Sequence, residues 1–210
     1  MSIPFDILYL FFFTAAALAL VPGPDNIFVL TQSAIYGRLA GLLISLGLCT
    51  GVLFHTSFVV LGVATIFSTS TLAFNLLKIF GAAYLTYLAW EAFQGGTATS
   101  NGTKEHIRLS AGKLYTRGVI MNVTNPKVGI FFLAFLPQFA DPNFGNLEGQ
   151  IIYLGIVFIL ATLLIFSGIA WFSGFLGEIL VKSKYAERVI NRIAGIIFIG
   201  LAVRLIITMH

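Results

Sequence analysis

Six apolar segments, separated by shorter polar stretches, make up most of the chain. Each is long enough to cross a bilayer core of about 30 Å as a helix. Because backbone hydrogen bonds must be satisfied within the membrane, α-helix is the conformation expected for the uninterrupted segments. The six segments are 5–35, 42–67, 73–90, 118–139, 151–175 and 189–208.

Two of the six segments are interrupted by proline and by polar side chains. The first contains VPGPDN and the fourth contains TNPK, each within a run of apolar residues. Proline has no amide hydrogen and cannot continue the helix that precedes it, but it is favoured at the first position of a new helix. We therefore expect two broken helices, with the breaks formed by Pro22, Gly23, Pro24 and Pro126.

The composition favours a membrane protein with one domain. Of the 210 residues, 58% are hydrophobic and 10% are charged, whereas soluble domains carry about 25% charged residues. The longest polar stretch, 91–117, is rich in Gly, Ser and Thr and is typical of a linker. The sequence thus predicts a single all-α membrane domain over 1–210, with three helices in 1–90, a linker at 91–117 and three helices in 118–210.

Basic residues are distributed unevenly between the two sides of the predicted bundle. Nine lie on one side and only Lys78 and Arg204 on the other, while Lys127 lies inside the fourth segment. Because cytoplasmic loops are enriched in Lys and Arg, we expect the linker in the cytoplasm and both termini outside. A first segment that enters and leaves on the same side would instead place the N-terminus inside. The nine are Arg38, Lys104, Arg108, Lys113, Arg117, Lys182, Lys184, Arg188 and Arg192.

The third and sixth segments have similar sequences. LKIFGAAYL begins at residue 77 and NRIAGIIFI at residue 191, and the two breaks also occupy corresponding places. The first three segments and the last three form two sets. Because three is an odd number of helices, the second set must enter the membrane from the opposite side. The sequence therefore predicts a 3+3 inverted repeat. Paired broken helices in such repeats point to a binding site near the middle of the bilayer, and we expect the two repeats to rock about that site.

Each break presents the N-terminus of a half-helix, which carries free N–H groups and a partial positive charge. Asp25 lies in the first turn after its break, where the dipole favours it, whereas Lys127 has the unfavourable sign at its own break. Ionisable residues within a membrane cost about 2.5–3.5 kcal/mol on insertion scales and are candidates for function. Lys127 therefore requires a negative partner, either Asp25 in a permanent ion pair or the carboxylate of a substrate. Asn26 and Asn125 are candidates for binding substrate or for capping freed backbone groups.

His55 is the only ionisable residue of the second segment. An imidazole titrates near neutral pH and can relay protons, so His55 and Asp25 are candidates for proton coupling. The alternative for His55 is a structural hydrogen bond to a neighbouring helix.

Several classes of function receive no support from the sequence. The single cysteine, Cys49, provides no redox pair, and no cluster of acids, bases or metal ligands indicates an enzyme. We expect no cofactor and no metal site. The net charge of +4 comes from basic residues in short loops, which do not indicate nucleic-acid binding.

Four sequence motifs resemble those of a known family. PGPDN, GRLAGLLISLGLCTG, LKIFGAAYLTYL and NPKVGIFFLAFLPQF occur in this order and cover most of the chain. They are similar to motifs of the LysE/RhtB family of bacterial inner-membrane amino-acid exporters. The family motifs are carried here by Pro22, Gly23, Pro24, Asp25, Asn125, Pro126 and Lys127.

The resemblance implies export of a small amino acid or a close derivative across the inner membrane, driven by exchange for protons. In that case Asp25 binds the substrate ammonium or a proton in turn, and Lys127 and the two half-helix N-termini hold the substrate carboxylate. The alternatives are an exporter of metal or other small cations, and a membrane scaffold that transports nothing. The sequence leaves open which amino acid is carried and whether the chain forms a homo-oligomer.

Overall fold

The computed structural model describes residues 3–69, 71–94, 109–173 and 184–207, and all regular elements within these ranges are helical. The prediction of an all-helical protein is thus confirmed for the described chain. The elements are α1 (Phe5–Leu20), α2 (Pro24–Tyr36), α3 (Arg38–Thr69), α4 (Thr71–Phe93), α5 (Ala111–Val123), α6 (Pro126–Ile130), the π-helix η1 (Phe131–Phe135), the 3-10 helices η2 (Leu136–Phe139) and η3 (Pro142–Phe144), α7 (Leu147–Trp171) and α9 (Lys184–Ile207).

Both predicted breaks are confirmed. The axes of α1 and α2 differ by 66°, and those of α5 and the helical run from Pro126 to Phe139 by 50°. Pro24 and Pro126 each occupy the start of the second half-helix, where the missing amide hydrogen removes no hydrogen bond. Gly23 is fully extended between α1 and α2.

The number of membrane spans agrees with the sequence only in part. Within the described residues, α3, α7 and α9 are each long and apolar enough to cross a membrane, and counting each bent pair as one span gives up to five. The 23-residue helix α4 is not among the spans found within the described residues. The six-span arrangement therefore stays a prediction.

The predicted linker, 91–117, is longer than the structure allows. Helix α4 continues through Phe93, and α5 begins at Ala111. The start of α5 is amphipathic: Leu114 and Gly118, four residues apart, are buried, while the polar residues between them are exposed. Polar composition alone suggested a loop there, but the spacing of the buried positions is that of a helix.

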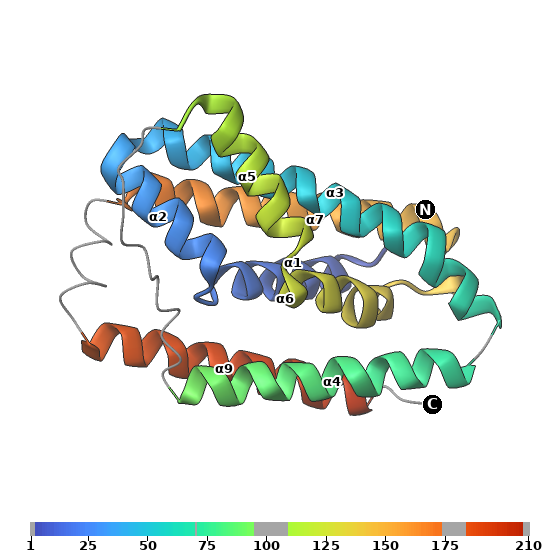
Figure 1. Cartoon of the computed structure of the whole chain (residues 1–210). Helices are drawn as coiled ribbons and strands as arrows, with labels where there is room; N and C mark the ends of the chain where they lie inside the picture. The colour runs from blue at the N-terminus through green and yellow to red at the C-terminus, as the bar shows by residue number, and fades with distance from the viewer. Residues whose placement is uncertain (1–2, 70, 95–108, 174–183, 208–210) are drawn as a thin grey trace.

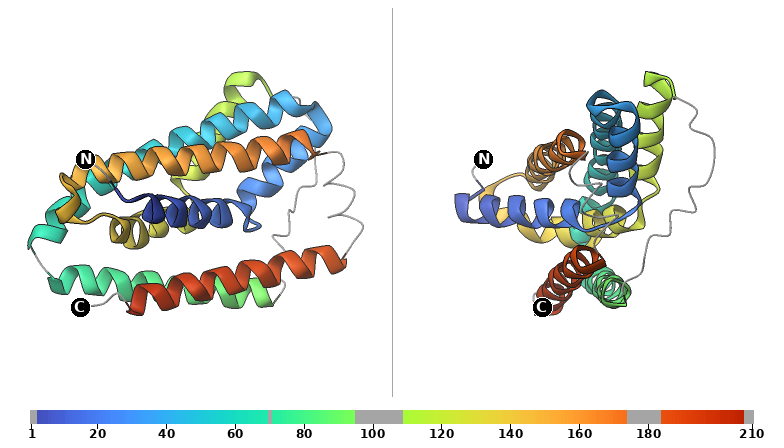
Figure 2. Two further views of the ribbon diagram at one scale, coloured as in Figure 1. Left: turned by 180° about the vertical axis from the view of Figure 1, so that it is seen from behind. Right: turned by 90° about the vertical axis from the view of Figure 1, so that its left-hand side faces the viewer.

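The helices form two layers. Helices α4 and α9 run side by side as a pair, and the other helices form a larger body next to this pair (Figures 1 and 2). Helix α3 runs through that body and packs against α5, α7 and α2, while α1 packs against α7. Because α4 belongs to the first predicted repeat and α9 to the second, both layers combine elements of the two repeats.

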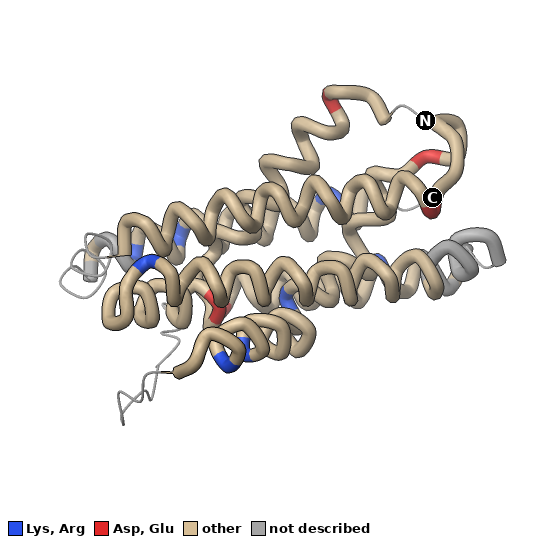
Figure 3. The backbone as a smooth tube through the Cα atoms, turned by 90° about the horizontal axis from the view of Figure 1, so that it is seen from above, with Lys and Arg blue, Asp and Glu red and all other residues tan. Residues whose placement is uncertain are grey.

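The two ends of the bundle differ in charge. Helix α1 begins and α9 ends at one end, whereas α2, α4 and α7 end at the other (Figure 1). Most of the described Lys and Arg residues lie toward the end where α3, α5 and α9 begin (Figure 3). There, the Arg38 guanidinium lies 4.3 Å from the centre of the Trp171 ring, and that of Arg117 lies 4.7 Å from the centre of the Phe28 ring.

Close backbone contact between α3 and α5 fixes one wall of the body. A Cβ atom added to Gly118 would collide with the carbonyl oxygen of Ile44 and would lie 3.1 Å from the Cα atom of Gly47. Glycine at both positions lets the two helices approach more closely than side chains would permit, as is common between membrane helices.

This contact predicts that Gly118→Ala destabilises the protein. We expect overpacking to cost about 1–3 kcal/mol and to lower the midpoint of thermal unfolding in detergent. Gly168→Ala on α7 is the matched control, because no atom lies within 4 Å of the Cβ it would add. An equal or higher midpoint for Gly118→Ala than for the control would contradict the packing.

Candidate functional site

The structure brings the two helix breaks together. The side-chain nitrogen of Asn125 donates a 2.7 Å hydrogen bond to Asp25 Oδ2, and both residues are buried. Asn125 also caps α6, since its Oδ1 accepts a 3.0 Å hydrogen bond from the backbone N–H of Lys127. Two candidates exactly 100 residues apart in sequence thus lie in direct contact between α2 and α6.

Lys127 binds the carbonyl groups that the first break leaves free. Its Nζ donates to the carbonyl oxygens of Val21, at 3.2 Å, and Leu18, at 3.3 Å. In an uninterrupted helix the carbonyl of Leu18 would accept from residue 22, but Pro22 has no N–H. The ammonium group therefore replaces the missing donor and lies at the C-terminal end of α1, where the helix dipole favours a cation.

Asp25 and Lys127, both in the described chain, do not form a direct ion pair. Asp25 accepts from Asn125, while Lys127 donates to the end of α1. The permanent clamp, which was one of the two alternatives for Lys127, is therefore not seen. The unfavourable dipole of α6 is offset by the neighbouring C-terminus of α1, which the sequence did not place beside Lys127.

Asn26 serves as a cap and retains a free acceptor. Its Nδ2 donates a 2.7 Å hydrogen bond to the carbonyl oxygen of Ala19, another group freed by the break. Its Oδ1 is buried and has no hydrogen-bond partner, and the same is true of Asp25 Oδ1. Two unpaired oxygens from adjacent residues are thus retained in the interior, where most polar atoms are paired.

Gly23 leaves space next to these groups. A Cβ atom added there would lie 3.5 Å from Lys127 Nζ and 3.9 Å from Asn26 Oδ1, both ordinary contact distances. A cation and an unpaired acceptor therefore border the same position. This arrangement suits a small zwitterion, whose ammonium group needs acceptors and whose carboxylate needs a cation.

His55 supports the second break. The carbonyl oxygen of Asn122 would ordinarily accept from residue 126, but Pro126 lacks the N–H; His55 Nε2 lies 3.0 Å from this oxygen and must act as the donor. The backbone N–H of Asn125 donates to the same oxygen. His55 therefore forms the structural hydrogen bond that was the alternative to proton relay, and its ring lies against Gly129.

Sequence reasoning missed the backbone part of this site. The carbonyl groups of Leu18 and Asn122 each lie four residues before a proline, and this spacing alone marks them as acceptors without a helical donor. Counting back from Pro22 and Pro126 would have found both. It would not have identified Lys127 and His55 as their partners, because these residues come from other helices.

The described residues contain no group of three or more His, Cys, Asp or Glu side chains that could hold a metal ion. Within the site itself, Asp25 is the one carboxylate among the predicted residues.

Comparisons with known proteins show the family of the chain. The family model described as LysE type translocator matches residues 16–209. A homoserine/homoserine lactone efflux protein of Salmonella typhimurium is 31% identical over 92% of this chain and 93% of its own length. A leucine efflux protein of Salmonella choleraesuis is 27% identical over 91% of this chain and 90% of its own length.

An uncharacterized membrane protein, YrhP, of Bacillus subtilis is 29% identical over 90% of this chain and 93% of its own length. No solved structure matches the chain. Since the family model spans nearly the whole sequence, including both helix breaks, this chain belongs to the family of LysE-type translocators.

Proposed function

We propose that this protein exports a small amino acid or amino-acid derivative across the bacterial inner membrane. The observation that carries the proposal is the proximity of a cation and an unpaired acceptor at Gly23, where an added Cβ atom would contact both Lys127 Nζ and Asn26 Oδ1. Asp25 Oδ1, the second unpaired oxygen, belongs to the same pair of adjacent residues. Relatives named as efflux proteins for leucine and for homoserine support the substrate class.

The proposed site binds the two charged groups of an amino acid separately. The substrate ammonium donates to Asp25 Oδ1 and Asn26 Oδ1, two oxygens that accept no hydrogen bond in the structure. The substrate carboxylate binds Lys127, whose ammonium has three N–H groups and uses two of them on α1. Asn125 orients Asp25 by its hydrogen bond to Oδ2 and leaves Oδ1 for the substrate.

Proton exchange at Asp25 supplies the driving force in this proposal. Asp25 is buried, and an unpaired buried carboxylate is costly. It therefore binds a proton when the substrate ammonium leaves. Export against a hundredfold gradient costs about 2.7 kcal/mol, at about 1.4 per tenfold. One proton moving inward gains about 2.3 kcal/mol per 100 mV, so one proton nearly suffices even before any pH gradient.

We propose that α4 and α9 move together against the other helices during transport. The 3+3 inverted repeat stays part of this proposal, supported by the matched breaks and by the pairing of α4 with α9 and of α3 with α7. Rocking of one whole repeat against the other is disfavoured, because α3 packs along both α5 and α7 of the second repeat. Helices α4 and α9 contact each other more than they contact the rest.

We also propose that the basic end of the bundle faces the cytoplasm. Three helices begin at this end, and Lys113 and Arg117 lie in the exposed first turns of α5. The pair α1 and α2 runs from the opposite end to this one (Figure 1), which supports a first segment that crosses the membrane. Both termini then lie outside.

A metabolite efflux screen tests the proposed function. Cells with and without the protein are compared for release of amino acids, with L-leucine and L-homoserine as the first two probes. We expect at least one amino acid to leave faster from cells that hold the protein. Release of metal ions alone, or no difference for any metabolite at equal expression, would contradict the proposal.

Asp25→Asn should abolish proton-driven uptake of the exported amino acid into inverted membrane vesicles. The amide can accept from Asn125 but carries no charge and cannot bind a proton, so we expect a loss of more than about tenfold, equivalent to about 1.4 kcal/mol. Lys127→Ala should have the same effect.

Two further variants serve as controls for Asp25→Asn. Glu148→Gln makes the same chemical change at an exposed position of α7 and should leave uptake unchanged. His55→Gln retains a donor for the carbonyl of Asn122 and should keep most of the activity. Loss of proton-driven uptake in His55→Gln, with substrate exchange intact, would show that His55 is a proton relay instead of a structural residue.

Gly23→Ala should weaken transport without unfolding the protein. The added methyl group meets no atom closer than 3.5 Å, and the extended backbone of Gly23 suits any residue. It would occupy the space between Lys127 and Asn26. We expect the KM of uptake to rise severalfold while the midpoint of thermal unfolding stays unchanged. An unaltered KM would mean that the substrate does not use this space.

Thiol labelling tests the orientation. Lys113→Cys and Glu148→Cys, each in a Cys49→Ala background, place a reactive group at opposite ends of the bundle. An impermeant maleimide should label Glu148→Cys in intact cells and Lys113→Cys only in inverted vesicles. The reverse pattern would place the termini in the cytoplasm.

A further inference from the structure

The α4–α9 pair shares a hydrophobic core with the larger body and contacts it beside the breaks. On α4, a Cβ atom added to Gly81 would lie 2.5 Å from the Cβ atom of Ala134 in η1 and 3.9 Å from Cγ2 of Ile130 in α6. On α9, the Arg204 guanidinium lies 4.3 Å from the centre of the Phe139 ring. These contacts fix the register between the two layers.

The register places Tyr84 beside the turn that runs from Lys127 to Phe131. Helix α4 and the run from α6 to η1 point in opposite directions (Figure 1). Moving three residues along α4 from Gly81 therefore corresponds to moving back along the other run from Ala134 and Ile130, the residues that Gly81 faces. Three residues span about 4.5 Å in a helix, close to one turn. This step leads from Gly81 to Tyr84 on one layer, and from Ala134 and Ile130 to Phe131 and Lys127 on the other.

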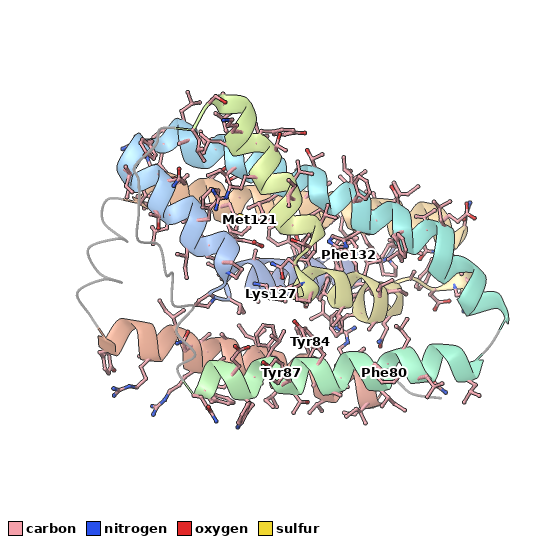
Figure 4. All side chains as sticks on the ribbon, viewed as in Figure 1. Phe80, Tyr84, Tyr87, Met121, Lys127 and Phe132 are labelled. Atoms are coloured by element: carbon pink, nitrogen blue, oxygen red, sulfur yellow. The ribbon has the colours of Figure 1, made fainter. Side chains whose placement is uncertain are left out.

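Tyr84 has a free hydroxyl group on the side of α4 that faces the larger body (Figure 4). The side chain is half-buried, and its ring centre lies 6.1 Å from that of Tyr87, one turn further along. Among the residues that the structure describes, none forms a hydrogen bond with its hydroxyl group. Figure 4 shows Tyr84 on the side of α4 that faces the layer carrying Lys127.

The site as described has fewer side-chain donors than a carboxylate can use. A carboxylate offers about four positions for hydrogen bonds, whereas Lys127 has only one N–H left after donating to Leu18 and Val21. The backbone N–H groups in the first turn of α2 add donors on the same side, but the unpaired side-chain atoms there, Asp25 Oδ1 and Asn26 Oδ1, are acceptors. A hydroxyl group from another element would add a second side-chain donor.

We propose that Tyr84 binds the substrate, donating its hydroxyl hydrogen to the same carboxylate that Lys127 holds. This inference rests on the proposed function. Asp25, Asn26 and Lys127 belong to the larger body, so Tyr84 is the contribution of the α4–α9 pair to the site. Binding of a carboxylate between the two layers draws them together, and its release lets them part. Substrate binding is thereby coupled to the movement of the α4–α9 pair.

Tyr84→Phe tests this contact in proteoliposomes that contain the purified full-length protein. The variant retains the ring and loses only the hydroxyl group. For L-leucine and L-homoserine we expect the KM to rise about tenfold, the loss of one hydrogen bond to a charged group, with kcat nearly unchanged. Tyr153→Phe is the matched control, since Tyr153 is a tyrosine of α7 that is 46% exposed; its kinetics should match those of the unsubstituted protein.

L-Leucinamide separates a contact with the carboxylate from a general effect on the site. This compound carries the ammonium group and side chain of leucine but no carboxylate. Tyr84→Phe should weaken inhibition of transport by L-leucine and leave inhibition by L-leucinamide unchanged. Equal weakening for both compounds would overturn the proposed contact.

The proximity of Tyr84 to Lys127 can be tested without a transport assay. In a Cys49→Ala background, a short bifunctional thiol reagent should cross-link Tyr84→Cys to Lys127→Cys. The control is Leu76→Cys, which lies two turns away on α4 and is 45% exposed. It should not be cross-linked to Lys127→Cys. Absence of the first cross-link would overturn the register.

The outcomes distinguish the two proposals. Transport by the unsubstituted protein with an unchanged KM in Tyr84→Phe would overturn the role of Tyr84 alone. Absence of amino-acid transport by the unsubstituted protein would overturn the proposed function and this inference with it.

Discussion

The structure of the site depends on one constraint: a backbone carbonyl without a donor cannot remain unpaired inside a membrane. Leaving such a group unsatisfied costs about 1–3 kcal/mol, and Pro22 and Pro126 each remove one donor from a helix. Lys127 supplies a donor to the carbonyl group of Leu18 that Pro22 leaves free. His55 adds a second donor to the carbonyl group of Asn122, which also accepts from the backbone N–H of Asn125. Asn26 does the same for Ala19. The broken helices therefore persist because side chains from other parts of the chain complete their hydrogen bonding.

The hydrogen bonds that complete the broken helices also determine which polar atoms remain available to a substrate. Side-chain donors are used on backbone oxygens, so the side-chain atoms that remain unpaired at the first break are acceptors: the Oδ1 atoms of Asp25 and Asn26. One N–H of Lys127 remains as well. This surplus of acceptors next to a single cation suits a substrate that carries an ammonium group and a carboxylate. The same residues thus serve the fold and the proposed function, and a substitution at Lys127 affects both.

The two packed layers of the structure do not coincide with the two predicted sequence repeats. The similarity between the third and sixth segments favoured two units of three helices. In the structure, α4 and α9, which carry those similar sequences, pair with each other as one layer. The glycine contact between α3 and α5 joins the two repeats within the other layer. If Tyr84 contributes to the site as proposed, the site lies between the larger body and the two-helix pair.

The sequence by itself determined the helical class, the positions of both breaks and the residues that surround them, because proline acts locally and apolar periodicity is readable in one dimension. It also predicted the linker, but placed its end too late at Arg117, since polar composition obscured the amphipathic start of α5. Only the tertiary structure decided the partners. The sequence left Asp25 and a substrate carboxylate open as partners of Lys127, whereas in the structure its ammonium group donates to the C-terminus of α1. Hydrogen-bond partners depend on which helix ends meet in space, and that is set by packing between distant segments.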